Sequence, residues 1–466
     1  MLPTPISRLN GNDITVLRTG EELQVKLNFY LLKSAVIGAL GGLLFGFDTA
    51  VISGATQSLT ATYHLGPRGL GTTVAIALWG TVVGALMAGP IGQKLGGRET
   101  LRIMAVLYVI SALGCGFAWD WPSLLVFRLI GGLGIGGSSV LGPVYIAELA
   151  PAQLRGRLVG LFQFAIVVGI LLAYFSNFCI ARLQMGPTEW RWQLGIAAVP
   201  AFLFLLLLFS IPRSSRWLVT QNRIDEARAV LLMMGTPDTE DELREIQASI
   251  HSERSQRAES IFKRKYLFPI FLAVSLGMFN QLSGINAVLY YLNDIFLKAG
   301  FSKTSGSLQA VMVGVMNLIA TVIAMSVIDK IGRKMLLLIG SVGMVISLCA
   351  VARIMLAQTH GNYLIVFLAV YTMSFAVSQG AVIWVYVSEI FPNSVRAKGQ
   401  SLGTSAHWVM NAVISWAFPQ MAASSGAYPF FFFAAMMVVQ FFVVLFVFPE
   451  TKGLTLEAMQ VQLGID

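Results

Sequence analysis

The sequence predicts an all-α polytopic membrane protein with twelve transmembrane helices, arranged as two six-helix, pseudo-symmetric bundles. Of its 466 residues, 56% are hydrophobic and only 12% are charged, whereas soluble domains carry about 25% charged residues. The apolar residues gather in about twelve runs, each long enough to cross a bilayer as a helix. The loop after the second run also has a close copy after the eighth run, which indicates two related halves.

The apolar runs fall into two sets of six on either side of a long polar stretch. In chain order they cover 31–56, 70–92, 101–119, 123–146, 158–180, 192–211, 267–290, 306–328, 335–356, 362–387, 400–423 and 428–448. A helix satisfies its own backbone hydrogen bonds inside a bilayer, and these runs lack the alternation of a barrel strand. Apolar residues recur at helical spacing within 213–265, so we expect short cytoplasmic helices there.

This pattern divides the chain into four parts. They are an N-terminal bundle (1–212), cytoplasmic linker helices (213–265), a C-terminal bundle (266–450) and a cytoplasmic tail (451–466). The repeated segments are Lys94–Arg98 and Lys330–Lys334, offset by 236 residues, and Glu148–Pro151 and Glu389–Pro392, offset by 241 residues. Two halves in the same orientation are typical of one architecture of alternating-access transporters.

The basic residues define the predicted topology. Stretches on the same side of the membrane as the N-terminus hold 25 Lys or Arg, and those on the other side hold about five. By the positive-inside rule, both termini are cytoplasmic, and we expect a multi-pass protein of the inner (plasma) membrane. The net charge of +9 therefore reflects topology, and no nucleic-acid partner is expected.

Asp48 lies inside the first apolar run, where an ionised carboxylate costs a few kcal/mol or more. Accepting a proton or pairing with a cation removes much of that cost. Arg128, in the fourth run, is the predicted partner, and its departure would let Asp48 take a proton. The alternative interpretations are an ion pair that only locks two helices, and an Arg128 side chain that extends to the outer interface.

Neutral polar residues form a second predicted site. The seventh run contains Asn280–Tyr291 (NQLSGINAVLYY), and Gly284 can interrupt that helix and turn its amides toward one cavity. Amides and phenols pair with hydroxyl groups without net charge, which suits a sugar better than an ion. Trp384, Trp408 and Trp416 offer flat faces to a sugar ring. The predicted substrate-binding residues are Gln163, Asn280, Gln281, Asn286, Tyr290, Asn317, Trp384, His407 and Asn411; for each one alone, interhelical hydrogen bonding is the alternative.

Charged residues at the inward helix ends form a predicted gate. Ion pairs among them would stabilise the state that is closed to the inside, whereas the alternative is that they are only solvated topology charges. The predicted gating residues are Glu148, Arg155, Arg157, Asp329, Arg333, Glu389 and Arg396.

The sequence gives no support for an enzyme. It has no phosphate-binding P-loop, no paired Cys/His spacing for a metal and no nucleophile elbow, so no metal or cofactor is expected. Without a P-loop, transport must be driven by a gradient or be passive.

Several motifs resemble the sugar porter family of the major facilitator superfamily, over about residues 30–453. They are GGLLFGFDTAVISGA, RLIGGLGIGG, PVYIAELAPAQLRGRL, QFAIVVGILLAY, NQLSGINAVLYY, DKIGRK, VSEIFPNSVRAKG and PETKG. The likeness is strongest to bacterial proton-coupled members, because in the first motif the sequence Phe45-Gly46-Phe47 is followed directly by the acidic residue Asp48. The resemblance implies a major facilitator fold. It also implies a sugar site lined by Gln163, Asn280, Gln281, Asn286, Tyr290, Trp384 and the position of His407. Gln93, Gly97 and Arg213 depart from the family pattern, and Ala381 replaces the usual proline before Trp384.

These observations favour a secondary active transporter that imports a pentose or hexose by proton symport through alternating access. The alternatives are a passive sugar uniporter and, with less support, a transporter-like sugar sensor or a drug antiporter. The expected partners are a monosaccharide, a proton and the lipid bilayer, and we expect the chain to act as a monomer.

Overall fold

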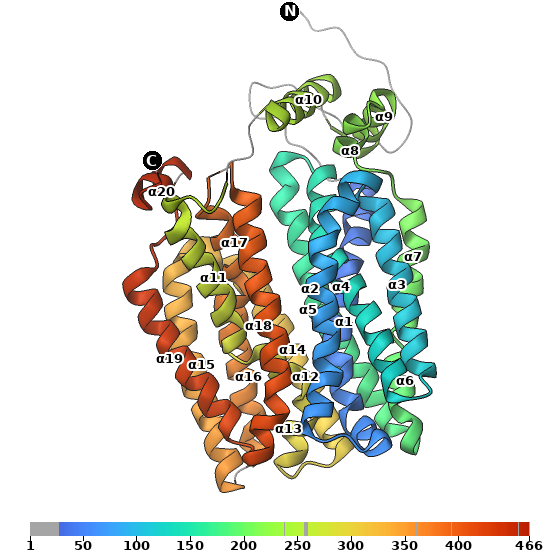
Figure 1. Ribbon diagram of the computed structural model, residues 1–466, viewed down its shortest axis with the longest axis vertical. Helices are drawn as coiled ribbons and strands as arrows, with labels where there is room; N and C mark the ends of the chain where they lie inside the picture. The colour runs from blue at the N-terminus through green and yellow to red at the C-terminus, as the bar shows by residue number, and fades with distance from the viewer. Residues whose placement is uncertain are drawn as a thin grey trace, which may run out of the picture.

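The computed structural model describes residues 28–236, 238–255, 260–359, 361–392, 394–454 and 456–465. Within those ranges the chain forms helices and no strands (Figure 1). The predicted all-α fold is therefore confirmed for this part of the chain. The first 27 residues of the predicted N-terminal bundle, and residues 455 and 466 of the predicted tail, lie outside the described residues.

Six spans form the N-terminal half, and three short helices follow them. The spans are α1 (Phe29–Tyr63), α2 (Pro67–Leu95), α3 (Gly97–Phe117), α4 (Trp121–Leu149), α5 (Ala152–Arg182) and a sixth built from η1 (Gly186–Thr188), α6 (Glu189–Gly195), α7 (Ala198–Leu207) and η2 (Leu208–Ser210). The linker forms α8 (Ser215–Thr220), α9 (Ile224–Met234) and α10 (Thr239–Ser255), which confirms the short helices predicted there.

The C-terminal half has more broken helices. Its elements are η3 (Arg264–Tyr266), α11 (Leu267–Leu282), α12 (Ile285–Tyr290), α13 (Leu292–Lys298), α14 (Lys303–Ile331), α15 (Arg333–Ala357), η4 (Gly361–Tyr363), α16 (Leu364–Phe375), the π-helical turn η5 (Ala376–Gly380), α17 (Ala381–Glu389), α18 (Arg396–Ser424), α19 (Tyr428–Val447) and the tail helix α20 (Leu456–Gln462).

Eleven segments within the described residues are long and apolar enough to cross a membrane. The predicted span that is not among them is the eleventh, which forms α18 and carries more polar residues, among them Gln400, His407 and Asn411. Large apolar side chains are exposed along the outside of the bundle, for example Val83, Leu86 and Ile110. A surface of this kind belongs in lipid rather than in water.

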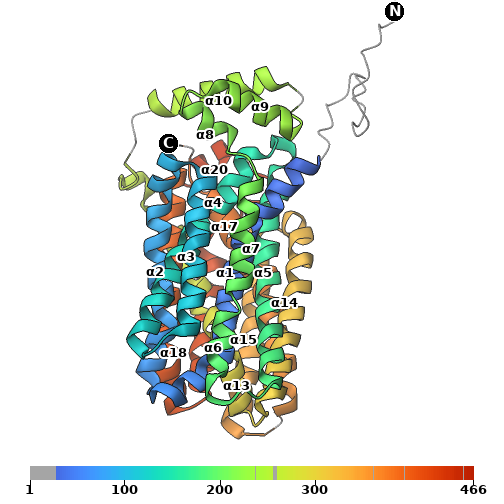
Figure 2. The same ribbon diagram turned by 90° about the vertical axis from the view of Figure 1, so that its right-hand side faces the viewer.

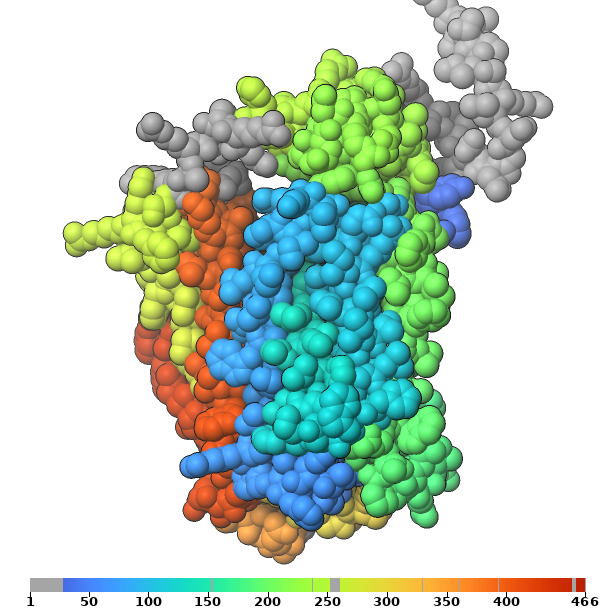
Figure 3. Space-filling model, turned by 45° about the vertical axis from the view of Figure 1, so that its right-hand side comes forward, coloured from blue at the N-terminus to red at the C-terminus, as the bar shows by residue number. Residues whose placement is uncertain are grey.

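The two halves stand side by side with the linker helices at one end (Figures 1 and 2). We call the end that carries α8–α10 and α20 the linker end, and the opposite end, which carries α13, the far end. Along the boundary between the halves, α2 packs against α18, and α5 packs against α14. Figure 3 shows the blue α2 and the orange-red α18 in contact along the face of the molecule.

The apolar core differs between the two ends. At the far end, one buried cluster contains residues of both halves, such as Ile52 and Trp190 with Leu289 and Phe296. Toward the linker end, each half has a buried cluster of its own. The halves are therefore joined by apolar packing at the far end and separate toward the linker end.

The predicted sequence repeat is a repeat of structure. Gly96 joins α2 to α3 with φ 89° and ψ 154°, and Gly332 joins α14 to α15 with φ 101° and ψ 155°. These angles are accessible only to glycine, so both copies of the motif require it at the turn.

Two local irregularities position the central side chains. Gly284, at φ 86°, separates α11 from α12, which confirms the predicted helix interruption. The tenth span contains the π-helical turn Ala376–Gly380 directly before Ala381. A π-helical turn is a common source of a bend, and this span therefore departs from regular α geometry without the proline that Ala381 replaces.

Candidate functional site

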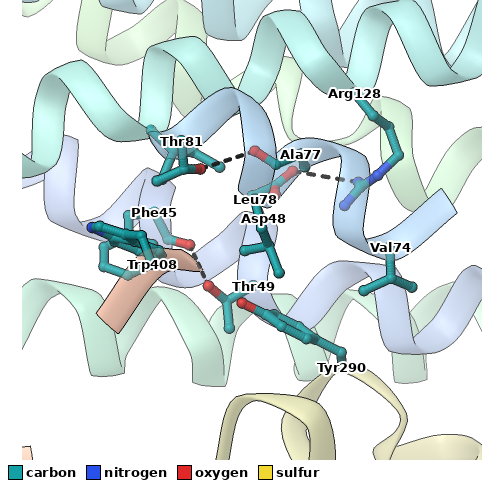
Figure 4. Close-up of a pocket in the computed structure, with 11 residues that line it drawn as sticks. Phe45, Asp48, Thr49, Val74, Ala77, Leu78, Thr81, Arg128, Tyr290 and Trp408 are labelled. Carbon is teal, nitrogen blue, oxygen red and sulfur yellow. Dashed lines mark hydrogen bonds and ion pairs between the residues drawn. The ribbon is translucent and has the colours of Figure 1, made fainter. Parts of the chain in front are cut away.

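Asp48 of α1 and Arg128 of α4 face each other inside the N-terminal half (Figure 4). Arg128 Nη1 lies 3.7 Å from Asp48 Oδ1, and Arg128 Nε donates a hydrogen bond to Thr73 O at 3.0 Å. The Arg128 side chain is only 4% exposed. The interpretation that Arg128 extends to a membrane interface is therefore wrong, because the guanidinium is held within the bundle by α1 and α2.

The ion pair is longer than a charge-assisted hydrogen bond, which usually joins N and O at about 2.7–2.9 Å. Asp48 is partly exposed, at 26%, and borders a small cavity of about 10 Å³. That is about the smallest space that holds one water molecule. The carboxylate is thus near its cation without being fully bound by it.

A larger cavity of about 150 Å³ lies between the two halves, and both halves line it. Six of the predicted substrate-binding residues line this cavity: Gln163, Asn280, Asn286, Asn317, Trp384 and His407. The helix break at Gly284 lets α12 leave the direction of α11, so that Asn280 and Asn286 reach the same space. The cavity therefore combines amides with aromatic faces.

The other three predicted residues lie behind this lining. Gln281 accepts a hydrogen bond from Asn286 Nδ2 at 3.1 Å, and its Nε2 lies 3.3 Å from both ring nitrogens of His407. Asn411 Nδ2 donates to Tyr290 Oη at 3.3 Å, and Tyr290 lines the small cavity beside Asp48. Gln281 thus fixes the orientation of lining residues, whereas Tyr290 and Asn411 belong to the Asp48 side.

Phe45 and Trp408 line both cavities. Their ring centroids are 5.3 Å apart, so the two rings together form a wall between the Asp48 pocket and the larger cavity. Phe45 is not among the predicted site residues, although it lies three residues before Asp48 and therefore on the same face of α1. Trp416 does not line either cavity, and its side chain is 41% exposed.

The predicted gating residues of the C-terminal half form a network at the linker end. Arg333 Nη2 pairs with Glu389 Oε1 at 2.9 Å, and Thr451 Oγ1 donates to Glu389 Oε2 at 2.6 Å. Glu450 accepts hydrogen bonds from the backbone N–H groups of Arg333 and Lys334. We expect Arg396 to pair with Glu389 in the state closed to the inside, whereas in this structure Arg396 Nε donates to Phe391 O at 3.4 Å.

The N-terminal half has a different arrangement at the linker end. Glu148 lies beside Ser214 and Arg216 of the linker. Among the described residues, Glu148 forms no ion pair with Arg155 or Arg157, and Arg155 Nε donates to Ala147 O at 3.1 Å. The side chain of Asp329 lies outside the described residues. The predicted gate is therefore divided into separate contacts within each half, which agrees with the separate clusters at that end.

Over residues 34–463, the chain matches the family described as "Sugar (and other) transporter". The chain belongs to this family of sugar transporters. This sugar transporter is 36% identical to the D-xylose-proton symporter of Escherichia coli (strain K12), over 92% of its own length and 95% of that protein. It is also 36% identical to the glucose transport protein of Synechocystis sp., over 93% and 97% of the two chains. The family is one of transporters rather than enzymes.

Solved structures of the xylose transporter XylE from E. coli show the same major facilitator fold. The transporter matches the partially occluded inward open conformation of XylE with a TM-score of 0.83 at 35% identity, over 92% of this chain and 100% of that one. It matches XylE bound to 6-bromo-6-deoxy-D-glucose with a TM-score of 0.76 at 35% identity, over 93% and 99% of the chains. The greater likeness to the inward open form agrees with halves that separate toward the linker end.

Proposed function

We propose that this chain imports a monosaccharide by proton symport through alternating access. The observation that carries the proposal is the pairing of Asp48 with Arg128 directly behind the Phe45–Trp408 wall of the amide-lined cavity. A proton-binding group and a sugar-sized site thus share two side chains. A change in the position of the Phe45 or Trp408 ring therefore alters both the Asp48 pocket and the larger cavity.

The sugar class follows from the lining of the larger cavity. Asn280, Asn286 and Asn317 provide donors and acceptors without net charge, and Trp384 and Trp408 provide apolar faces. This chemistry fits the hydroxyl groups and C–H surface of a pentose or hexose. The named substrates of the relatives, xylose and glucose, belong to these two classes.

The coupling follows from the cost of charge in the bundle. While Arg128 is near, Asp48 is stable as a carboxylate, and withdrawal of Arg128 favours its protonated form. The 3.7 Å separation means that a small displacement of α1 against α4 changes this balance. Sugar binding shifts the same equilibrium between conformations, and the coupling of the two ligands is reciprocal.

The proposed orientation places the linker end in the cytoplasm of a cell whose inner membrane the protein spans. The excess of basic residues on that side supports it. In the state closed to the inside, charged residues at the linker end would join the two halves; they are Glu148, Arg155, Arg157, Asp329, Arg333, Glu389 and Arg396. For the bundles, the linker and the tail, we propose the residue boundaries given in the sequence analysis. One chain contains the complete site, so we propose that it acts as a monomer.

The test is Asp48→Asn, which imitates the protonated acid permanently. Purified protein in proteoliposomes should no longer accumulate labelled xylose or glucose when a proton gradient is imposed. Exchange of labelled for unlabelled sugar without a gradient should continue. Accumulation that persists in the variant would contradict proton coupling through Asp48, and wild-type protein that equilibrates sugar without concentrating it would establish a uniporter.

A further inference from the structure

At the far end, a second acidic residue bridges the two halves. Asp294 of α13 belongs to the C-terminal half, and Gln57 Nε2 of α1 in the N-terminal half donates to its Oδ1 at 3.3 Å. α13 follows the span Arg264–Tyr290 rather than forming part of it. This contact exists only while the far end is closed, because it joins the two halves directly.

The second carboxyl oxygen of Asp294 has weaker support than the first. Oδ2 is inaccessible to solvent and has no hydrogen-bond partner among the described residues. The nearby hydroxyl of Thr56 donates to Ser53 O, and the Lys298 ammonium donates to Ala422 O at 3.0 Å. An unpartnered, buried carboxylate oxygen is costly, and protonation of the group removes most of that cost.

Among the described residues, the elements packed around α13 bring no cation other than Lys298 to this group. On α1, the facing side chains are the neutral Thr56 and Gln57, and Asp48 lies two turns deeper on the same helix. On α14, Lys303 Nζ is paired with Glu189 Oε2 of α6 at 2.9 Å. Tyr291 precedes α13, and Lys298 lies one turn after Asp294. Gln57, Asp294 and Lys298 themselves line a cavity of about 520 Å³. Its walls from α2, α15, α18 and α19 are apolar and consist of Pro67, Leu70, Met355, Phe418 and Phe430.

We propose that Asp294 is a second proton-responsive residue of the transport cycle, whose protonation favours closure of the far end. The inference rests on the proposed proton-coupled function. In that function, Asp48 carries the proton beside the sugar. Protonation of Asp294 makes closure of the far end more favourable after a sugar has entered from an acidic far side.

The direction of the pH effect follows from linkage. Burial raises the pKa of the Asp294 carboxyl from its ordinary 3.8 to about 6, and the Thr56 and Gln57 side chains and the Lys298 ammonium oppose that rise. A far end that opens returns the group to water and to its ordinary value. The closed state therefore gains stability as the pH falls through about 6, and the gain is complete below about 4. Between pH 7.5 and 5, the ratio of closed to open molecules should rise about tenfold.

The experiment measures the far end without sugar and without a gradient. Spin labels are placed on cysteines introduced at Arg68 and Gln358, both exposed at that end, in a protein that lacks Cys115, Cys179 and Cys349. Asp48→Asn is included in every sample, so that Asp48 does not titrate. Distances are then measured in detergent between pH 7.5 and 5. We expect the short-distance population to rise about tenfold relative to the long one.

Adding Asp294→Asn should abolish this pH step and leave the closed population high at every pH. Glu189→Gln is the matched control, because it removes a far-end carboxylate that is paired; it should lower the closed population at all pH values and preserve the step. Lys298→Gln should move the midpoint to a higher pH. A pH step that survives Asp294→Asn, or a midpoint that does not respond to Lys298→Gln, overturns the proposal. Loss of proton-driven uptake in the wild type would instead contradict the proposed function, and it is measured separately.

Discussion

Asn286 is the residue at which the supporting network meets the larger cavity. Its side chain lines the cavity and donates to Gln281 Oε1, and Gln281 in turn lies against His407. Asn286→Ala should weaken binding of the transported sugar by about 1–3 kcal/mol, as expected when a hydrogen-bond partner is lost in a buried site. Isothermal titration calorimetry in detergent measures this loss.

The control for Asn286→Ala is Asn293→Ala. Asn293 is buried in the same half, but it bonds Ser307 and lies outside the cavity. It should lower thermal stability and leave sugar affinity unchanged. Equal affinity losses in both variants would contradict a specific role for Asn286. Gln281→Ala should also reduce affinity, because Asn286 and His407 lose the group that orients them.

At this scale, the sequence identified residue types better than positions. Six of the nine predicted substrate-binding residues line the larger cavity, since amides and aromatic rings inside spans are rare enough to stand out. The sequence did not separate Asn286, which lines the cavity, from Gln281, which lies behind it. That distinction depends on how α12 turns after Gly284. Phe45 was missed because a phenylalanine in an apolar run has no distinguishing chemistry.

Among the helices, the turn at Gly332 between α14 and α15 should be sensitive to substitution. A Cβ at Gly332 would lie 2.7 Å from Glu450 Oε2, and Glu450 holds the backbone N–H groups of Arg333 and Lys334. Gly332→Ala should therefore add the clash to backbone strain of about 1–3 kcal/mol. The midpoint of thermal unfolding, followed by tryptophan fluorescence, should fall.

Gly300→Ala is the matched control for this element. Gly300 has a similar φ of 92°, but a methyl group at this position would have no neighbouring atom within 4 Å. Its substitution introduces strain alone and should lower the midpoint less than Gly332→Ala does. If the two variants unfold at the same temperature, the contact with Glu450 does not contribute to stability.

The order and approximate length of the helices follow from the apolar runs, because the bilayer requires about 20 apolar residues per span. The π-helical turn Ala376–Gly380 was not predictable, since no proline marks it and the backbone irregularity depends on packing against α14 and α15. The partner of Glu389 in this conformation was also not predictable. The turn at Gly332 brings Arg333 to Glu389 from a different helix, and separation along the chain does not reveal that contact.

For the whole molecule, the proposed orientation predicts which surfaces are accessible from outside the cell. Single cysteines at Arg68 or Gln358, at the far end, should react with a membrane-impermeant maleimide in intact cells, in a background without native cysteines. A cysteine at Asp241, in α10, should react only after the cells are opened. The reverse pattern would show that the linker end faces outward.

The two-bundle architecture was predictable because repeated motifs and loop charges act over the whole chain. The conformation was not, since one sequence must adopt at least two arrangements of the same halves. The distribution of buried clusters distinguishes them: the halves share one cluster at the far end and have separate clusters toward the linker end.

The shared apolar cluster at the far end also has a thermal consequence. Opening that end exposes apolar surface to water, which increases heat capacity, whereas ion pairs such as Arg333–Glu389 lie at the other end. Apolar association weakens on cooling, so the closed far end loses part of its advantage as the temperature falls. The fraction of molecules that are open at the far end should therefore increase as the temperature falls. The logarithm of the ratio of open to closed molecules, plotted against reciprocal temperature, should be curved rather than a straight van't Hoff line.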